Sequence, residues 1–176
     1  MSAFVFETQR LILREFDIRD AQSFYDLNKD IEVIKYTGDK AFESLASAKS
    51  FLEAYDHFQL HGFGRWAVVR KADEKFIGWC GLKLNEEEYI DIGFRFFRNE
   101  WNKGYATESA IATLNYGFNI LNLPEIIGRV AKDNTASVSV LEKLGLTFWK
   151  KGLCHGLEDS LYYRITKSEF NNIFNN

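Results

Sequence analysis

Two periodicities of apolar residues divide this chain into expected strands and expected helices. Apolar and polar residues alternate in the expected strands, which are residues 11–16, 65–70, 76–84, 89–96, 125–130, 146–154 and 160–166. Apolar residues recur every three or four positions in the expected helices, which are residues 21–27, 44–62, 106–121 and 135–144, and a last helical turn covers residues 167–174. Asp17, Asn134 and either Ser44 or Ser47 stand where helix N-terminal caps are expected, and Gly62 stands where the second helix should end.

The elements follow the order strand, two helices, three strands, helix, strand, helix and two strands. This order predicts an α/β fold with a mixed, mostly antiparallel sheet, in which one helix crosses between the fourth and the fifth strand. A doubly wound dinucleotide-binding sheet does not fit, because Gly104 lacks the regularly spaced partner glycines of that fingerprint. The chain has one proline, Pro124, and no repeat, linker or low-complexity tract. We therefore expect a single domain over residues 1–176, with its core at about residues 8–168.

A short loop between the expected strand at residues 89–96 and the next helix is the most informative segment. Residues 99–108 read Asn-Glu-Trp-Asn-Lys-Gly-Tyr-Ala-Thr-Glu. Such a loop can direct several backbone N–H groups at one point, at the positive end of the helix dipole. Gly104 and Ala106 are small enough to let a phosphate group approach the backbone. The loop predicts a site for a phosphate-bearing ligand, and an ordinary helix start is the alternative.

Composition and charge narrow the range of functions. Apolar residues make up 46% of the chain, and its 16 Phe predict a globular protein with a phenylalanine-rich core. A net charge of −3 argues against a nucleic-acid-binding protein. No stretch reaches the ~18 apolar residues of a membrane span, and no signal peptide is recognisable. Cys80 and Cys154 lack metal or redox spacing, and the helix-spaced pair His57 and His61 has no third ligand. We expect a cytoplasmic protein with reduced thiols and with no metal, nucleic-acid or membrane partner.

Four segments of the chain, in this order and at this spacing, resemble one known family. They are Thr-Gln-Arg-Leu-Ile-Leu-Arg at residues 8–14, Ile-Gly-Trp-Cys-Gly at 77–81, the run from Asp-Ile-Gly-Phe to Trp-Asn-Lys-Gly-Tyr-Ala-Thr-Glu at 91–108, and the run from Asn-Thr-Ala-Ser to Leu-Glu-Lys-Leu-Gly at 134–145. Together they resemble the GNAT superfamily of acyl-CoA-dependent N-acetyltransferases over nearly the whole chain. Within it, the chain looks most like the branch of the Rim-type (RimJ/RimL-like) ribosomal-protein N-terminal acetyltransferases.

The resemblance implies a GNAT-like domain, with helices around a sheet whose central strands splay apart, and acetyl-CoA as the cosubstrate. In the family, the pantetheine arm lies between the splayed strands, where backbone groups of residues 94–96 would pair with it. The diphosphate would bind amides of residues 101–107, and Asn134 or Ser137 would hydrogen-bond the cofactor. Two lysines could also offset phosphate charge. The expected cofactor-binding residues are Phe94, Arg95, Phe96, Trp101, Asn102, Lys103, Gly104, Tyr105, Ala106, Thr107, Asn134, Ser137 and Lys143.

Asp91 is the first candidate for the catalytic base. An amine must lose a proton before it attacks a thioester, and a carboxylate within reach can accept that proton directly or through water. Glu88 is the second candidate. Side chains alternate along a strand, so Asp91 shares a face with Arg95, and an ion pair between them is the alternative interpretation.

The chain departs from the family pattern at three positions. Many members have a tyrosine general acid where Leu141 stands, so the proton donor is not identified. Tyr162 or Tyr163, on a late strand, is a candidate donor, with packing as the alternative. In the loop, Trp101 replaces a Gln or Arg, and Asn102 replaces a residue that is often Gly in this branch.

These features predict an enzyme that moves an acetyl group from acetyl-CoA to a primary amine by direct attack. A protein N-terminal amine is the first candidate acceptor, and residues 36–61 would form most of the acceptor site. A polyamine or antibiotic acetyltransferase and a non-catalytic acyl-CoA-binding module are the alternatives, and a generic phosphate-binding domain is a weaker one. The acceptor, the physiological role and the choice between monomer and homodimer stay open at this point.

Overall fold

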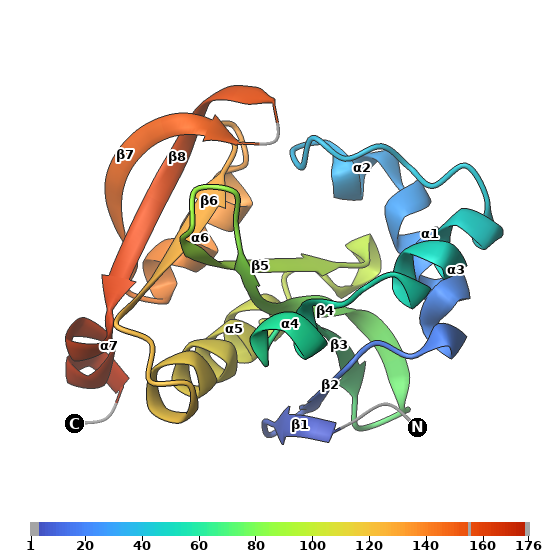
Figure 1. The fold of residues 1–176 in the computed structure, drawn as a ribbon, viewed down its shortest axis with the longest axis horizontal. Helices are drawn as coiled ribbons and strands as arrows, with labels where there is room; N and C mark the ends of the chain where they lie inside the picture. The colour runs from blue at the N-terminus through green and yellow to red at the C-terminus, as the bar shows by residue number, and fades with distance from the viewer. Residues whose placement is uncertain (1–3, 155, 175–176) are drawn as a thin grey trace.

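The computed structural model describes residues 4–154 and 156–174. Its strands and helices are β1 (Phe4–Glu7), β2 (Leu11–Arg14), α1 (Ala21–Lys29), α2 (Ile31–Ile34), α3 (Leu45–Glu53), α4 (His57–His61), β3 (Arg65–Arg70), β4 (Lys75–Leu84), β5 (Ile90–Phe96), α5 (Tyr105–Asn115), β6 (Glu125–Val130), α6 (Thr135–Lys143), β7 (Thr147–Cys154), β8 (Leu157–Thr166) and α7 (Lys167–Phe174). In Figure 1, β5 crosses the centre of the molecule, with α1, α2 and α3 on one side and β6, β7 and β8 on the other. Within the described ranges, no helix is long and apolar enough to cross a membrane.

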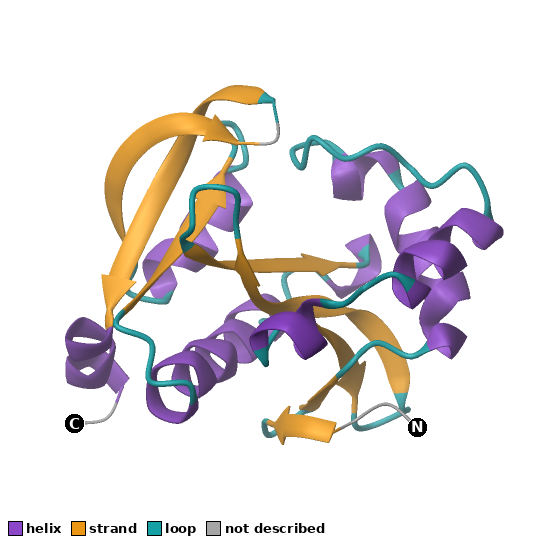
Figure 2. Ribbon diagram, in the orientation of Figure 1, coloured by secondary structure: helices purple, strands orange, loops and turns teal. Residues whose placement is uncertain are grey.

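The strands form one 8-stranded sheet in the order β1-β2-β3-β4-β5-β6-β8-β7. Neighbouring strands are antiparallel, except that β5 and β6 are parallel. Parallel neighbours need a crossover connection, and α5 provides it on one face of the sheet, as Figure 2 shows. The predicted mixed sheet, with one helix crossing between its parallel strands, is therefore confirmed.

The parallel pair β5 and β6 separates soon after it forms. The paired positions are Asp91 with Ile127 and Ile92 with Gly128, although β5 continues to Phe96. Beyond Ile92, the edge of β5 that faces β6 has no strand beside it in the described part of the chain. We call this place the fork. It confirms the predicted splaying of the central strands.

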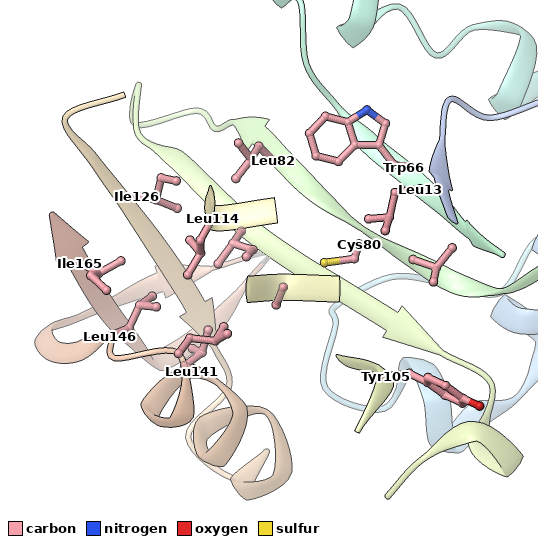
Figure 3. Close-up of a cluster of buried hydrophobic side chains, with 14 of the residues drawn as sticks. Leu13, Trp66, Cys80, Leu82, Tyr105, Leu114, Ile126, Leu141, Leu146 and Ile165 are labelled. Atoms are coloured by element: carbon pink, nitrogen blue, oxygen red, sulfur yellow. The ribbon is translucent and has the colours of Figure 1, made fainter. Parts of the chain in front are cut away.

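The phenylalanine-rich interior consists of two clusters of different size. The main core fills the space between the sheet and α5, and Figure 3 shows Leu13, Trp66, Cys80, Leu82, Leu114, Ile126 and Ile165 among its buried side chains. The second cluster joins α1 to α3 and contains Ala21, Phe24 and Leu52, with Phe16, Phe42, Phe76 and Trp79 packed against it. Both cysteines are buried and free.

The structure corrects the sequence prediction mainly near the N-terminus. The strand β1 and the short helix α2 were not expected, and the single helix predicted for residues 44–62 is two helices, α3 and α4. The break between them lets Leu52 pack in the second cluster while Phe58 packs against the main core. Ser44, rather than Ser47, is the N-cap of α3, since its side chain accepts the Ser47 N–H and the Ser47 side chain accepts the Ser44 N–H in return. Gly62 ends α4 with φ 74°, as predicted.

Candidate active site

A cavity of about 400 Å³ opens at the fork and extends to either side of it. On the β6 side its wall includes the start of α6, and on the other side it includes aromatic residues of α1 and α3. The predicted site residues that line the cavity are Asp91, Phe94, Arg95, Asn134 and Ser137. The predicted residues that lie outside the cavity wall are Phe96, Lys143 and the loop from Trp101 to Thr107. Five of the predicted residues, from β5 and from the start of α6, therefore line one cavity, and their role in binding stays a prediction.

The loop before α5 has the backbone conformation that an anion site needs. Gly104 is the N-cap of α5 with φ 82°, and no side chain caps the helix there. The first N–H groups of an α-helix have no partner inside the helix, so those of α5 remain available to an anion. Asn102 also takes a left-handed conformation, with φ 60°. Asn is among the few non-glycine residues that tolerate this conformation, which explains why it can replace the glycine frequent in the family.

Trp101, the other departure in the loop, closes the loop onto the end of β5. Its indole Nε1 donates a hydrogen bond to the carbonyl oxygen of Phe96 at 2.9 Å. The Trp101 side chain thus fixes the path of the chain between β5 and α5. Phe96 itself is buried in the main core, because its side chain points to the face of the sheet that α5 covers.

Arg10 and Thr8 hold the first turn of α5, a role that the sequence analysis missed. The Arg10 guanidinium donates to Glu108 Oε2 at 2.6 Å and to the Lys103 carbonyl oxygen at 3.0 Å, and the Thr8 hydroxyl donates to Glu108 Oε1 at 2.5 Å. Burial opposes the charge of Glu108, but these hydrogen bonds outweigh it and lower the pKa of the carboxyl. Arg10 is therefore a cation beside Gly104. The sequence signal for this role was a basic residue, Arg10, within segment 8–14. Its contact with the loop depends on the tertiary fold.

The two predicted lysines differ in their surroundings. Lys103 Nζ lies 3.0 Å from Glu100 Oε2, and the same oxygen accepts a hydrogen bond from Arg70 at 2.8 Å. Lys103 thus shares a buried carboxylate with a second cation and keeps its position at the loop. Lys143 is exposed near the end of α6 and does not line the cavity.

Asn134 caps α6, as its position in the sequence suggested. Its Oδ1 accepts the Ser137 N–H at 3.2 Å, and both residues line the cavity. Leu141, on the same helix, also lines the cavity and is buried. The cavity wall therefore carries an apolar side chain where many members of the resembled family carry a tyrosine.

Asp91 lies in the cavity wall, but two arginines hold its carboxylate. Arg65 Nη2 lies 2.5 Å from Asp91 Oδ1, and Arg129 Nη2 lies 2.7 Å from Asp91 Oδ2. Burial opposes the charge of Arg129, but Asp91 and Glu86 keep its pKa above the ordinary value. The alternative ion pair with Arg95 is wrong, since Arg95 pairs with Asp39. Asp91 thus joins β3, β5 and β6 just where the fork begins.

Gly93 makes room for Arg65, which explains the glycine inside a strong strand. A Cβ atom on Gly93 would lie 2.7 Å from the Arg65 guanidinium. The pairing of β4 with β5 continues through Gly93 without a shift of register, so the glycine marks no bulge in that pair. The close neighbour of Gly93 is the Arg65 side chain and not a second backbone.

Replacing Gly93 by alanine should displace the Arg65 guanidinium from Asp91. We expect a loss of about 1–3 kcal/mol in the free energy of unfolding, which is typical of an added methyl group in a filled space. Chemical denaturation of Gly93→Ala measures this loss. In an Arg65→Met background the same substitution should cost clearly less, because the displaced group is absent. Equal costs in both backgrounds would contradict this role of Gly93.

The two late tyrosines are engaged in packing and hydrogen bonding outside the cavity. The Tyr162 hydroxyl is hydrogen-bonded to Glu87 Oε1 at 2.5 Å and to the Leu153 carbonyl oxygen at 2.7 Å. Burial, and then the hydrogen bond to Glu87, raises the pKa of Tyr162 to about 12. Tyr163 is buried and faces Glu142 at 3.5 Å. Both positions favour the packing alternative over a proton donor in the cavity.

Comparison with known proteins agrees with the fold. A family profile described as "Acetyltransferase (GNAT) domain" matches residues 10–147. The "uncharacterized N-acetyltransferase" YnaD of Bacillus subtilis (strain 168) is 35% identical over 170 residues, which are 93% of this chain and 98% of YnaD. The crystal structure of a GNAT-family acetyltransferase from Bacillus anthracis superposes with a TM-score of 0.78 at 30% identity and covers 94% of this chain and 99% of that chain. The chain therefore belongs to the GNAT family of acetyltransferases.

A more distant structure shares the fold. It is the spermidine N-acetyltransferase from Vibrio cholerae in complex with CoA and spermine, with a TM-score of 0.78 at 22% identity, over 93% of this chain and 99% of that chain. Among the described residues, no group of His, Cys, Asp and Glu is arranged to hold a metal ion.

Proposed function

We propose that this protein transfers the acetyl group of acetyl-CoA to a primary amine. The fork is the observation that carries the proposal. It combines an open β5 edge, a loop that leads to the uncapped N-terminus of α5, and a cavity that reaches the aromatic residues of α1 and α3. An open strand edge can pair with an extended, amide-containing chain, and a helix N-terminus can bind a diphosphate.

Three parts of the chain would hold acetyl-CoA. Backbone N–H groups of residues 104–107 would bind the diphosphate, and Arg10 and Lys103 supply positive charge beside them. Backbone groups of residues 94–96 would pair with the pantetheine arm. Asn134 and Ser137 supply short polar groups on the opposite side of the fork. The CoA present in the Vibrio cholerae complex supports this ligand.

Direct attack fits the residues of the cavity better than a covalent enzyme intermediate. First, the ammonium form of the acceptor loses a proton. The amine nitrogen then forms a bond to the thioester carbonyl carbon and gives up a second proton. The C–S bond breaks, and the CoA thiolate that leaves takes up one proton. Burial raises the pKa of Cys80 and of Cys154, so neither is a ready nucleophile. N–H groups on the open β5 edge could polarise the carbonyl.

We infer that Asp91 acts mainly as a positioning residue. Both of its carboxylate oxygens accept hydrogen bonds from Arg65 and Arg129, so taking a proton would break one of these ion pairs. By holding β3, β5 and β6 together, Asp91 keeps the fork open at a fixed place. Its role as the base stays a prediction, and Glu88, exposed on the turn before β5, stays the second candidate.

The sequence leaves two classes of acceptor, a protein N-terminal amine and a small-molecule amine, which is either a polyamine or an antibiotic. A protein N-terminal amine follows from the resemblance to the Rim-type branch. A polyamine gains support from the spermidine N(1)-acetyltransferase of Escherichia coli (strain K12), which is 25% identical over 77% of this chain. A cytoplasmic location and the choice between monomer and homodimer also stay predictions.

Thermal unfolding with added ligands tests the proposed function. A ligand that binds the native state alone adds about 2.7 kcal/mol of stability at a hundredfold excess over its Kd. Acetyl-CoA and CoA should raise the unfolding temperature, while NAD and ATP should not. Release of free CoA in the presence of an amine then separates an enzyme from a non-catalytic acyl-CoA-binding module. No shift at millimolar acetyl-CoA would overturn the proposal.

A further inference from the structure

The part of the cavity away from α6 is walled by aromatic rings. Phe16, Phe24, Phe42, Phe51 and Tyr55 all line it. The rings contact one another, with centroid distances of 5.2 Å for Phe16 and Phe24, 5.4 Å for Phe24 and Phe51, and 5.2 Å for Phe16 and Tyr55. They come from α1, α3 and the loops beside them, and so form one continuous apolar surface. We call these five residues the aromatic wall.

The charges that line the same cavity are mostly positive. The cationic lining residues are Lys40, Arg65, Lys83, Arg95 and Arg129, and the anionic ones are Asp39 and Asp91. Both aspartates are already paired with arginine, since Asp91 contacts Arg65 and Arg129, and Asp39 Oδ2 lies 2.5 Å from Arg95 Nη2. A polycation would therefore meet, among the described residues of the cavity wall, five cationic side chains and two carboxylates that are each already in an ion pair. Like charges at close range would instead oppose its binding.

Arg95 is suited to bind an anionic group in this cavity. Its guanidinium lies 5.3 Å from the centre of the Trp79 ring and is hydrogen-bonded to Asn28 and Asp39. These two contacts use two of the five N–H groups of a guanidinium, and the remaining ones can bind a carboxylate. The side chain is 10% exposed, so packing holds it in place beside the aromatic wall.

We propose that the acceptor is a primary amine that carries an aromatic or bulky apolar group and a carboxylate, and that it is not a polyamine. The aromatic wall binds the apolar group, Arg95 binds the carboxylate, and the amine faces the fork. This inference rests on the proposed function, because it names the acceptor of the same acetyl transfer. A free aromatic amino acid has all three features and serves as the probe.

A panel of matched amines tests the proposal on the unmodified protein. The probes are phenylalanine, phenylalanine amide (which lacks the negative charge), alanine (which lacks the ring) and spermidine, each with saturating acetyl-CoA and with CoA release as the readout. We expect kcat/KM for phenylalanine to exceed that for each of the other three by at least about tenfold, which corresponds to about 1.4 kcal/mol. A higher kcat/KM for spermidine or for the amide overturns the proposal.

The variant Arg95→Gln tests the residue that is assigned to the carboxylate. It should lower kcat/KM for phenylalanine and leave that for the amide nearly constant, so that the ratio of the two falls toward one. Arg19→Gln is the matched control, because Arg19 is a mostly exposed arginine paired with Asp17 outside the cavity. An unchanged ratio in Arg95→Gln would contradict the assignment even if the variant were less stable.

Binding without turnover separates this inference from the proposed function. Calorimetry with N-acetylphenylalanine and with spermidine reports the preference of the cavity whether or not acetyl transfer occurs. Tighter binding of N-acetylphenylalanine supports the inference, and tighter binding of spermidine overturns it. Binding of acetyl-CoA together with a preference for spermidine would remove the inference and leave the proposed function intact.

Discussion

Replacing Asp91 by asparagine should lower the free energy of unfolding by about 3–5 kcal/mol, the range typical of removing one partner of a buried ion pair. The Asp91 side chain is 4% exposed, and those of Arg65 and Arg129 are 15% and 4% exposed. Asparagine keeps the shape of the side chain but leaves both guanidinium groups without their shared counter-charge. At roughly 2–4 °C per kcal/mol for a chain of this size, the unfolding temperature should fall clearly.

Asp159→Asn provides the matched control for this loss of charge. The Asp159 side chain is 60% exposed and lies 3.5 Å from Lys132, and exposed ion pairs contribute about 0–1 kcal/mol. In chemical denaturation, the loss in the free energy of unfolding should therefore be several times larger for Asp91→Asn than for Asp159→Asn. A loss in Asp91→Asn as small as that in the control would contradict the role of Asp91 in holding β3, β5 and β6 together.

The same variant distinguishes positioning from base catalysis. Turnover is measured well below the unfolding temperature, with saturating amine and over a range of pH. If Asp91 only positions other groups, kcat should fall while the plot of kcat against pH keeps both of its limbs, because the group that titrates as the base is another residue. If the stability hardly changes while a limb of the pH profile disappears, Asp91 is the base, as the sequence first suggested.

The variant Gly104→Asp should weaken acetyl-CoA binding by about a hundredfold, equivalent to about 2.7 kcal/mol. The substitution places a carboxylate at the N-terminus of α5, where the diphosphate would bind, and like charges repel. It also forces a residue with a Cβ atom into a left-handed conformation at φ 82°. Calorimetric titration with acetyl-CoA measures the effect directly.

Gly62→Asp separates the effect of the charge from that of the backbone. Gly62 is also left-handed, at φ 74°, and a Cβ atom there meets no other atom within 4 Å. The two variants thus share the backbone strain and the added charge, but Gly62 ends α4 and lies outside the loop before α5. Acetyl-CoA affinity should stay near that of the unmodified protein in Gly62→Asp. Equal weakening in both variants would count against the loop as the diphosphate site.

Local patterns were sufficient wherever neighbours in the chain decide the structure. The alternation of residues 65–70, 76–84 and 89–96 predicted β3, β4 and β5 to within a residue. Gly104 indicated a loop that leads into a helix, and the structure has Gly104 as the left-handed N-cap of α5 with no side-chain cap; anion binding by this loop stays a prediction. Asn134 was recognisable as a cap because capping involves residues three positions apart.

Other features were not predictable because their partners are distant in the sequence. Asp91 was placed on the correct face of its strand, but its partners Arg65 and Arg129 lie 26 and 38 residues away. Arg10 reaches Glu108 across 98 residues. The alternative interpretation, an ion pair of Asp91 with Arg95, is wrong because proximity within one strand does not decide which of several arginines a buried carboxylate meets.

The sequence by itself determined the α/β class, the order of most strands and helices, and the glycine-containing loop that leads into α5. These properties depend on periodicity, on caps and on glycine conformation, all of which act over a few residues. The tertiary structure alone decided how long β5 and β6 stay together, which arginines hold Asp91, and that the phenylalanines of α1 and α3 wall the cavity. The physical reason is that buried charges and aromatic rings are stabilised by whatever the fold brings next to them, and a linear pattern does not specify those neighbours.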